Sequence, residues 1–406
     1  MHCPGWVDGA GVATYSSLLT VRDYPALVLA SGLGVGAGVF GGLALATLVF
    51  AGTGSPLLAA VAMFGPAFGH LVGASLLLHR ADRIPPRVGL VTLALAMGAL
   101  LAVLAIPGLP VLAVVVLVLG SGVLASLNAA VRWGLVAEVL PAESYLLGRS
   151  VVQMTTGAVQ IGGNAVAAGL LLLLDPATVL LVAAGLDGVA ALVLVLGLSS
   201  RAPRATGRAA RGATWAGNRR LWALPGVPAT YLALWVPNGL VVGAEALFVP
   251  YAGAAAGLLF TAGALGMLAG DAVMGRLVPA SWRPRLVTPT RLLLAVPYLA
   301  FAAGPAVPVA AVLVAVASAG FSAGLLLQER LLALTPGQDR GHALGLHSSG
   351  MLAAQGIAAV LAGALAEAFG AQWAMTAVAI ASVAVTIALT PVLRQPVPAA
   401  ARSGTA

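Results

Sequence analysis

The chain lacks lysine, so the 20 residues counted as Lys or Arg are all arginine. It also has a single cysteine, Cys3. A Walker-type phosphate loop needs a Gly-Lys pair, so its absence argues against ATP-driven transport by this chain alone. One cysteine excludes an internal disulfide and a cysteine-based metal site. Charge is scarce as well: 8% of residues are charged and 60% are hydrophobic, which excludes an ordinary soluble globular protein.

Twelve long apolar stretches fill most of the chain. Each has about 20 residues or more, which is enough for a helix to cross roughly 30 Å of hydrocarbon. Strands of a membrane barrel would be near ten residues long and would alternate polar with apolar side chains. We therefore predict an all-α polytopic membrane protein. The predicted spans lie near 25–50, 55–78, 87–106, 110–132, 147–173, 176–198, 227–250, 254–276, 286–304, 307–329, 341–369 and 372–393.

Arginine occurs in every second connection between these spans. The connections expected to carry it hold Arg80, Arg83 and Arg87; Arg132 and Arg149; Arg201 to Arg220; Arg276, Arg283 and Arg285; and Arg330 and Arg340. The intervening turns, such as Ala51–Gly54 and Gly370–Gln372, have no positive charge. Because arginine-bearing loops stay in the cytoplasm, we expect both termini to be cytoplasmic in an inner (plasma) membrane protein.

The net charge of +8 is explained by this topology. Arginines in short loops beside the membrane face anionic lipid headgroups, so we expect lipid contacts and no nucleic-acid partner. The first 24 residues lack the pattern of a cleavable signal. The predicted organisation is a cytoplasmic tail (1–24), a six-helix bundle (25–198), a flexible cytoplasmic linker (199–226), a second six-helix bundle (227–393) and a cytoplasmic tail (394–406).

The two bundles contain related segments. Pro141 matches Pro336 and Gln160 matches Gln355 at one offset, across an ungapped stretch of loop and helix. Such a match suggests duplication, and parallel repeats are typical of transporters with a binding site between two bundles. Chance agreement in low-complexity sequence is the alternative.

At these residues the chain resembles the major facilitator superfamily. The segment ASLNAAVRWGLVAEVLPAESYLLGRSVVQMTTGAVQIGG is similar to the branch that contains enterobactin and macrolide exporters. This resemblance implies twelve transmembrane helices in two six-helix halves. It also implies a secondary active transporter that rocks its halves in alternating access.

The family's loop between spans two and three carries an Asp-Arg pair followed by basic residues. Here Asp82, Arg83 and Arg87 match it, and the second half offers Asp271 and Arg276. Leu78 replaces the family's glycine, and Pro85-Pro86 replaces its Gly-Arg. The resemblance implies that the acidic and basic residues latch the cytoplasmic side closed. Ordinary loop topology is the alternative.

The antiporter motif of span five is altered in this chain. The family pattern Gly-Pro-x-x-Gly-Gly resembles Gly163, Asn164 and Ala167-Ala168 here. The small residues still permit close helix packing, but the proline bend is lost. This departure weakens the case for obligate antiport.

Two carboxylates lie inside apolar spans: Asp187 in span six and Glu245 in span seven. A charged side chain at the bilayer centre costs about 2.5–3.5 kcal/mol on insertion scales. Both are therefore candidates for taking up and releasing a coupled proton. The alternative is a structural acid that joins two helices. Glu367, near the end of span eleven, is expected to be solvated.

Polar stripes predict which helices face a water-accessible cavity. Residues three, four or seven apart share one face of a helix. Three such stripes are present, and hydrogen bonds between helices, worth under about 2 kcal/mol, are the alternative explanation for each. The candidate cavity residues are Gln153, Thr156, Gln160 and Asn164 in span five, Trp235 and Asn238 in span seven, and His347 and Gln355 in span eleven.

We predict a proton-coupled exporter of small amphipathic organic molecules, such as drugs or natural products. An importer of the same fold is the first alternative. A membrane-embedded enzyme or a sensor is the second, but no convergent acid/base cluster or extra domain supports it. The histidines form no ligand pattern, so we expect no metal, no cofactor and no catalytic residues. We expect a monomer whose partners are the substrate, protons and lipids.

Overall fold

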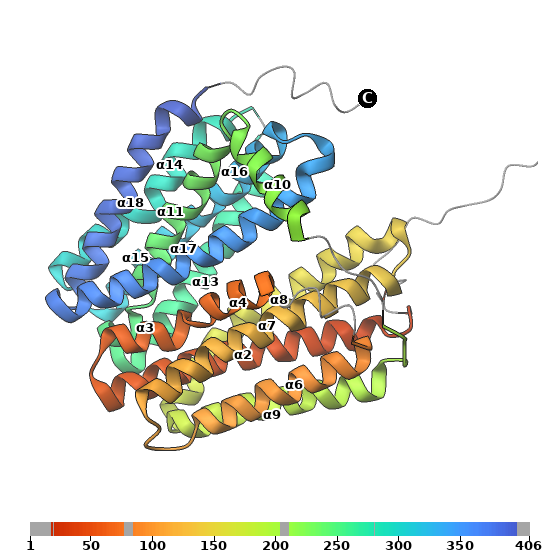
Figure 1. The fold of residues 1–406 in the computed structure, drawn as a ribbon. Helices are drawn as coiled ribbons and strands as arrows, with labels where there is room; N and C mark the ends of the chain where they lie inside the picture. The colour runs from red at the N-terminus through yellow and green to blue at the C-terminus, as the bar shows by residue number, and fades with distance from the viewer. Residues whose placement is uncertain (1–17, 19, 77–83, 204–210, 280, 396–406) are drawn as a thin grey trace, which may run out of the picture.

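The computed structural model describes residues 18, 20–76, 84–203, 211–279 and 281–395. All regular structure in these ranges is helical, and twelve helical segments are long and apolar enough to cross a membrane. The predicted all-α polytopic fold is confirmed. The helices form two six-span halves, one from α2 to α9 and one from α11 to α18 (Figure 1).

Within the described residues the first half contains seven helices, because its second span is broken. They are α2 (Tyr24–Thr53), α3 (Pro56–Phe64), α4 (Pro66–Leu76), α6 (Pro86–Leu104), α7 (Val111–Val139), α8 (Ala142–Leu173) and α9 (Pro176–Gly197). The break falls at Gly65-Pro66, where proline cannot donate a backbone hydrogen bond to the preceding turn. Past the break α4 packs closely on α7, since a Cβ added at Gly69 or Gly122 would overlap the facing backbone.

The second half has more local breaks. Its elements are α11 (Val227–Glu245), α12 (Phe248–Ala252), η1 (Gly253–Ala255), α13 (Ala256–Ala272), η2 (Val273–Leu277), α14 (Arg283–Ala295), η3 (Val296–Ala303), α15 (Val307–Ala319), η4 (Gly320–Ser322), α16 (Ala323–Leu334), η5 (Gly337–Asp339), α17 (Arg340–Phe369) and α18 (Ala371–Leu393). Pro297 marks the change of the ninth span to a 3₁₀ helix, and Pro237 lies inside α11. Prolines at these points remove ladder hydrogen bonds and allow a helix to bend.

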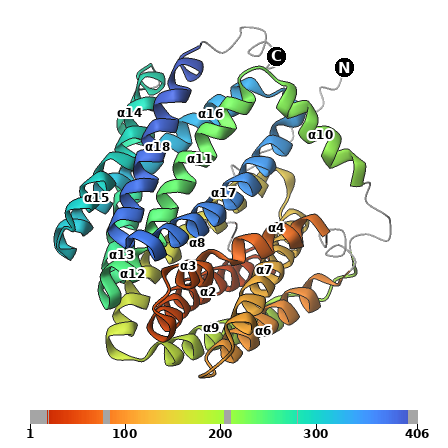
Figure 2. The same ribbon diagram turned by 60° about the vertical axis from the view of Figure 1, so that its left-hand side comes forward.

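The halves meet at one end of the bundle. We call it the arginine-free end, because its turns near Gly54, Gly304 and Gly370 carry no arginine; the opposite end is the arginine end. At the arginine-free end Glu367 of α17 accepts hydrogen bonds from the Ser55 hydroxyl and from the Leu57 amide at the start of α3, the latter at 3.3 Å. Figure 2 shows the halves converging here and diverging towards the other end.

Close backbone packing reinforces this junction. A Cβ added at Gly363 would lie 2.7 Å from Cα of Leu57 in the other half, and one added at Gly257 would overlap Ala168. The largest apolar cluster also crosses between the halves and includes Leu43 of α2 and Phe248 of α12. The small residues of the altered antiporter motif thus serve the helix contact that closes this end.

The segment between the halves contains a helix that the sequence did not indicate, α10 (Arg211–Ala223). Trp222 at its end packs on Tyr231 and Trp235 of α11, with ring centroids 5.9 and 6.1 Å apart. Part of the predicted flexible linker is therefore a helix docked on the second half.

Arg132, Arg149 and Arg291 are among the arginines that lie inside helices and not in connections. Arg132 is in α7, Arg149 is in α8, and Arg291 is in α14 within the ninth span. The expectation that arginine is confined to span ends was wrong. Span four is longer than predicted because α7 continues to Val139, and Arg291 is the largest of the fully buried side chains in the described part of the chain.

Candidate functional site

A cavity of about 490 Å³ lies between the two halves, and we call it the central cavity. Helices α3 and α8 of the first half and α11, α12, α13, η4, α16 and α17 of the second contribute to its wall. The lining residues that carry polar groups are Gln160, Asn164, Asn238, Glu245, Asp271, Gln328 and Gln355. Most of the remaining wall is apolar and aromatic.

Four of the eight predicted cavity residues line it. Gln160 and Asn164 come from α8, Asn238 from α11 and Gln355 from α17. The Gln355 side chain donates a 3.0 Å hydrogen bond to Oδ1 of Asn238, and Asn164 donates a 2.9 Å bond to the Gln160 carbonyl. Gln160 of α8 and Gln355 of α17, which the internal repeat matches, thus line the same cavity from opposite halves.

Glu245 also lines the central cavity, at the end of α11. It is half-buried, and the structure gives it no hydrogen bond or ion pair within the described residues. Phe248 and Phe260 stand beside it in the wall, with ring centroids 4.9 Å apart. An acid that faces a cavity from aromatic surroundings is placed to exchange a proton with water or a ligand.

The other four predicted cavity residues are not among the lining residues. The Trp235 indole N–H donates to the His347 carbonyl at 3.1 Å and lies 3.3 Å from Nδ1 of the His347 ring. The indole also stacks on the Tyr231 ring, with centroids 4.7 Å apart. Trp235 and His347 therefore join α11 to α17. Gln153 and Thr156 lie nearer the arginine end of α8, where the Thr156 hydroxyl donates to the Gln153 carbonyl at 3.0 Å.

The predicted latch is only partly visible. Asp82 and Arg83 lie outside the described residues. Arg87 donates a 2.6 Å hydrogen bond to the Val195 carbonyl near the end of α9, inside its own half. Asp271 lines the central cavity towards the arginine end, and Arg276 is exposed on η2. The described latch residues make no hydrogen bond or ion pair with a described residue of the other half in this conformation.

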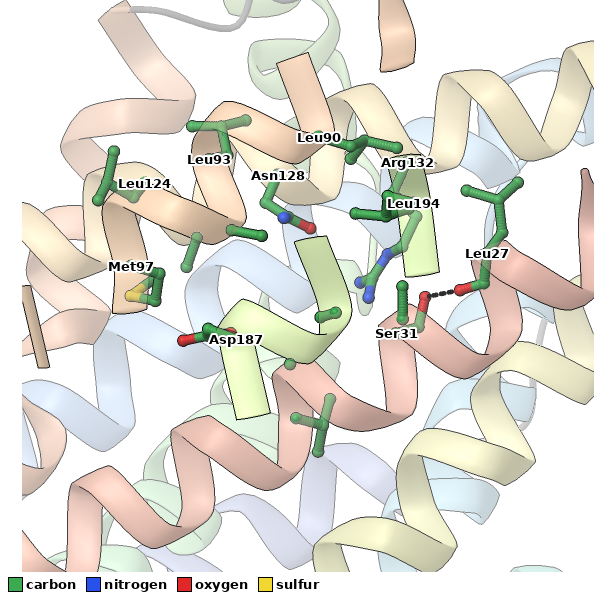
Figure 3. A pocket seen from close by; sticks show the side chains of 16 residues that line it. Leu27, Ser31, Leu90, Leu93, Met97, Leu124, Asn128, Arg132, Asp187 and Leu194 are labelled. Atoms are coloured by element: carbon green, nitrogen blue, oxygen red, sulfur yellow. Dashed lines mark hydrogen bonds between the residues drawn. The ribbon is translucent and has the colours of Figure 1, made fainter. Parts of the chain in front are cut away.

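Asp187 does not reach the central cavity. It lines a second cavity of about 200 Å³ enclosed by α2, α6, α7 and α9, which we call the N-half cavity (Figure 3). Arg132 lines the same cavity from α7, with Asn128 one turn before it. Sequence analysis placed Arg132 in a loop and so missed that two opposite charges line one cavity.

The second half has a smaller cavity at the equivalent place, about 20 Å³ in volume and lined by Arg291; we call it the C-half cavity. Arg291 is 1% exposed, and its three guanidinium nitrogens have no hydrogen-bond partner among the described residues. The signal was present in the sequence, since Arg291 lies within the run LVTPTRLLLAV, beyond the first turn of its span.

Both halves use the same tyrosine contact to hold their helices. The Tyr24 hydroxyl of α2 donates to the Gly148 carbonyl of α8 at 2.7 Å. The Tyr231 hydroxyl of α11 donates to the Ala343 carbonyl of α17 at 3.1 Å. Gly148 and Ala343 are separated by the same offset as Gln160 and Gln355. The repeat seen in the sequence is thus also a repeat of contacts.

A polar knot fixes the arginine end of the first half. Asp23 accepts bonds from the Ser199 amide at 2.9 Å, from the Ser199 hydroxyl and from Arg201 at 2.9 Å. Arg201 also pairs with Glu138 at 3.1 Å. Burial alone would raise the pKa of Asp23, but the bonds from Ser199 and Arg201 outweigh it and lower the pKa.

Within the described residues, no group of three or more His, Cys, Asp or Glu side chains is arranged to hold a metal ion. The central cavity offers carboxylates, amides and aromatic rings. Such a set can bind and release an organic molecule and can carry a proton.

Residues 251–406 match the family model of the Major Facilitator Superfamily. No curated protein matches the sequence. These 156 residues do not include the first half, so the match supports the superfamily from the second half alone.

Solved structures are similar over nearly the whole chain. One is a bacterial homolog of the human lysosomal transporter Spinster in an inward-facing, unoccupied conformation, with 13% identity, a TM-score of 0.69 and coverage of 94% of this chain and 97% of that one. Another is a POT family transporter in complex with 5-aminolevulinic acid, with 13% identity, a TM-score of 0.69 and coverage of 92% and 96%. The nucleoside transporter NupG has 10% identity, a TM-score of 0.69 and coverage of 91% and 100%.

The chain therefore has the fold of major facilitator transporters and is a multi-pass membrane protein. At these identities the structures show the fold alone. The similarity to enterobactin and macrolide exporters stays a prediction.

Proposed function

We propose that this chain is a secondary active transporter that carries a small organic molecule through the central cavity. The observation that supports this most is a cavity of about 490 Å³ at the junction of two repeated halves that touch at one end. This volume is in the range of ligand sites, roughly 300–1,000 Å³. Rocking the halves about their contact would expose such a cavity to alternate sides.

The lining favours an amphipathic substrate that is neutral or cationic. Glu245 and Asp271 are the acidic residues of the wall, and no arginine is part of it. Apolar side chains such as Phe64, Phe260 and Phe321 supply surface for a hydrophobic body. A cavity lined by charge of one sign attracts ligands of the other sign.

Proton coupling is assigned to Glu245 in this proposal. It has no hydrogen bond or ion pair among the described residues and lines the same cavity as Asn238 of its own helix and Gln355 of α17, so a proton and a substrate would compete for the same space. Asp187 remains a second candidate, but it lies in another cavity and could act only through the helices between. Glu245 is thus the better-supported coupling site.

Export from the cytoplasm is the proposed direction. With the arginine end in the cytoplasm, the closed arginine-free end makes this conformation inward-open. Asp82, Arg83 and Arg87, with Asp271 and Arg276, would then close the inner side when the cavity turns outward. An ion-pair latch that must break in each cycle is worth only about 1 kcal/mol.

The proposal can be tested with inverted membrane vesicles and ethidium, an amphipathic cation. Vesicles that contain the protein should accumulate ethidium when their lumen is acidified, and Glu245→Gln should lower this accumulation at least tenfold. Glu329→Gln is the matched control, because Glu329 is an exposed glutamate whose ion pair among the described residues is with Arg283 at 3.7 Å.

The outcomes distinguish the alternatives. Gradient-driven loss of ethidium from the vesicles would favour an importer of the same fold. A panel of amphipathic cations and neutral compounds that shows no gradient-dependent flux would contradict transport and favour a membrane sensor or enzyme. Wild-type flux in Glu245→Gln across pH 6 to 8 would remove Glu245 as the coupling residue.

A further inference from the structure

The N-half cavity is separate from the central cavity. Its volume is about 200 Å³, and none of the residues that line it also lines the central cavity. A cavity needs only about 10–15 Å³ of such volume to hold one water molecule. The N-half cavity is therefore large enough for a small organic molecule, and the proposed substrate route does not pass through it.

Two opposite charges line this cavity without pairing. Asp187 is 4% exposed and its Oδ2 is buried with no hydrogen-bond partner among the described residues. Nε of Arg132 is buried and unpartnered in the same sense. Their side chains form no ion pair within 4.0 Å, and Figure 3 shows them on different sides of the cavity with Asn128 between them. Charges buried this way are costly unless something completes them.

The remaining polar groups do not complete them. The Ser31 hydroxyl donates to the Leu27 carbonyl at 2.6 Å. The Asn128 amide has no hydrogen bond within the described ranges and also faces the cavity. The cavity is thus lined by a carboxylate, an amide and a guanidinium, and the Cζ of that guanidinium also lies over the Trp133 ring at 5.3 Å from its centroid.

The second half shows that the fold does not require this arrangement. The repeat offset places Leu327 at the position of Arg132, Ala323 at that of Asn128 and Ser382 at that of Asp187. The Ser382 hydroxyl donates to the Pro237 carbonyl at 3.3 Å. The C-half cavity has shrunk to about 20 Å³ beside Arg291. The open, doubly charged cavity is specific to the first half.

We propose that the N-half cavity is a binding site for a small zwitterion. The ligand's ammonium group pairs with Asp187, and its carboxylate or other anionic group pairs with Arg132 and accepts a bond from Asn128. Hydrogen bonds between charged groups are short and about twice as strong as neutral ones, and a guanidinium can bind a carboxylate with two of them. A ligand with one charge would leave the other buried charge unpaired.

Binding to the purified full-length protein in lipid nanodiscs tests the site. The probes are ω-amino acids from glycine to 6-aminohexanoate, whose length sets the separation of the two charges, compared with butylamine and butyrate. Isothermal titration should show that one chain length binds best and at least tenfold more tightly than either single-charge probe. Asp187→Asn and Arg132→Gln should each weaken that binding at least tenfold.

Matched variants guard against loss of fold. Asp175→Asn changes an exposed aspartate that caps the same helix, α9, and should leave binding unchanged. Asn128→Leu keeps the number and branching of the side-chain heavy atoms but removes the amide, without touching either charge, and should also weaken binding at least tenfold. Absence of binding by every ω-amino acid would overturn the proposal. Binding that persists in Asp187→Asn and Arg132→Gln, or equal binding of butylamine, would overturn it as well.

Discussion

The two halves share a scaffold but differ in what fills it. Tyr24 and Tyr231 make equivalent hydrogen bonds to α8 and α17, so the helices of each half are held in the same way. The first half keeps an open cavity with Asp187 and Arg132, whereas Arg291 occupies the corresponding space in the second. The comparison teaches that contacts between helices are preserved by the repeat, while interior charge is free to change and marks where the halves have separate roles.

The largest expected effect concerns volume at the two arginines. Arg291→Ala should be about 3 kcal/mol less stable than Arg291→Met, because truncation leaves a void in a filled space. The same comparison at Arg132 should give less than about 1 kcal/mol, because its cavity is already open. Chemical unfolding in detergent measures both differences. Equal differences at the two sites would break the contrast between a filled half and an open one.

The contact between the halves is the next point of attack. Gly363→Leu should disfavour the closed arginine-free end by about 2 kcal/mol, because an added side chain meets Leu57. That energy shifts the two conformations about thirtyfold. Alkylation of a reporter cysteine at Gln328, in a Cys3→Ser background, should slow at least tenfold as the arginine end closes.

Gly345→Leu is the control for this experiment. It lies on the same helix, α17, and a Cβ there meets nothing within 4 Å. If both leucine variants slow alkylation equally, the glycine contact at Gly363 does not set the conformation.

The ion pairs at the arginine end also differ between the halves. In the first half, Asp23 is buried where it pairs with Arg201. In the second half, Asp339 pairs with Arg220, whose side chain is largely exposed. Asp23→Asn should cost about 2 kcal/mol at pH 7, and Asp339→Asn less than about 0.5 kcal/mol.

The pH dependence of the Asp23 effect follows from its lowered pKa. A carboxyl whose pKa falls on folding stabilises the protein above its ordinary value of 3.8, and this contribution is lost as pH falls through the folded-state pKa. The stability difference between wild type and Asp23→Asn should therefore be present at pH 7 and shrink below pH 3.8. A difference that is constant from pH 7 to 3 would mean that the knot acts through shape and not through charge.

The smallest effect is expected where the halves agree. Tyr24→Phe and Tyr231→Phe should each cost about 1 kcal/mol, because each loses one buried hydrogen bond to a carbonyl. Equilibrium unfolding of the two variants should give the same loss within about 0.5 kcal/mol. Clearly unequal losses would show that the equivalent tyrosine hydrogen bonds contribute different amounts of stability in the two halves.

The sequence predicted the spans, because length and hydrophobicity determine them. It also predicted several residues that line the central cavity, because helical spacing shows which side chains share a face. Gln160, Asn164, Asn238 and Gln355 were chosen by that spacing and line the cavity. Trp235 was predicted to face the cavity, and the structure places its indole against His347 on α17. Spacing gives a common face but not which neighbour that face meets.

The interior arginines were harder to predict for different reasons. Arg132 was assigned to a loop because hydropathy ends a span at the first charge, although α7 continues to Val139. Arg291 was overlooked because Arg283 and Arg285, in the first turn of the same helix α14, were assigned to a loop and accounted for the charge of that region. The N-half cavity depends on the packing of four helices, and no local pattern encodes that.

The anchored linker sets a mechanical limit on the transport cycle. Ser199 and Arg201 are held by Asp23 in the first half, and α10 begins at Arg211 and rests on the second half. Only residues 202–210 remain to bridge the two anchors. Nine residues reach about 30 Å when fully extended. The short chain between the halves thus limits how far their arginine ends can separate. It thereby limits the size of any molecule that can enter from that side.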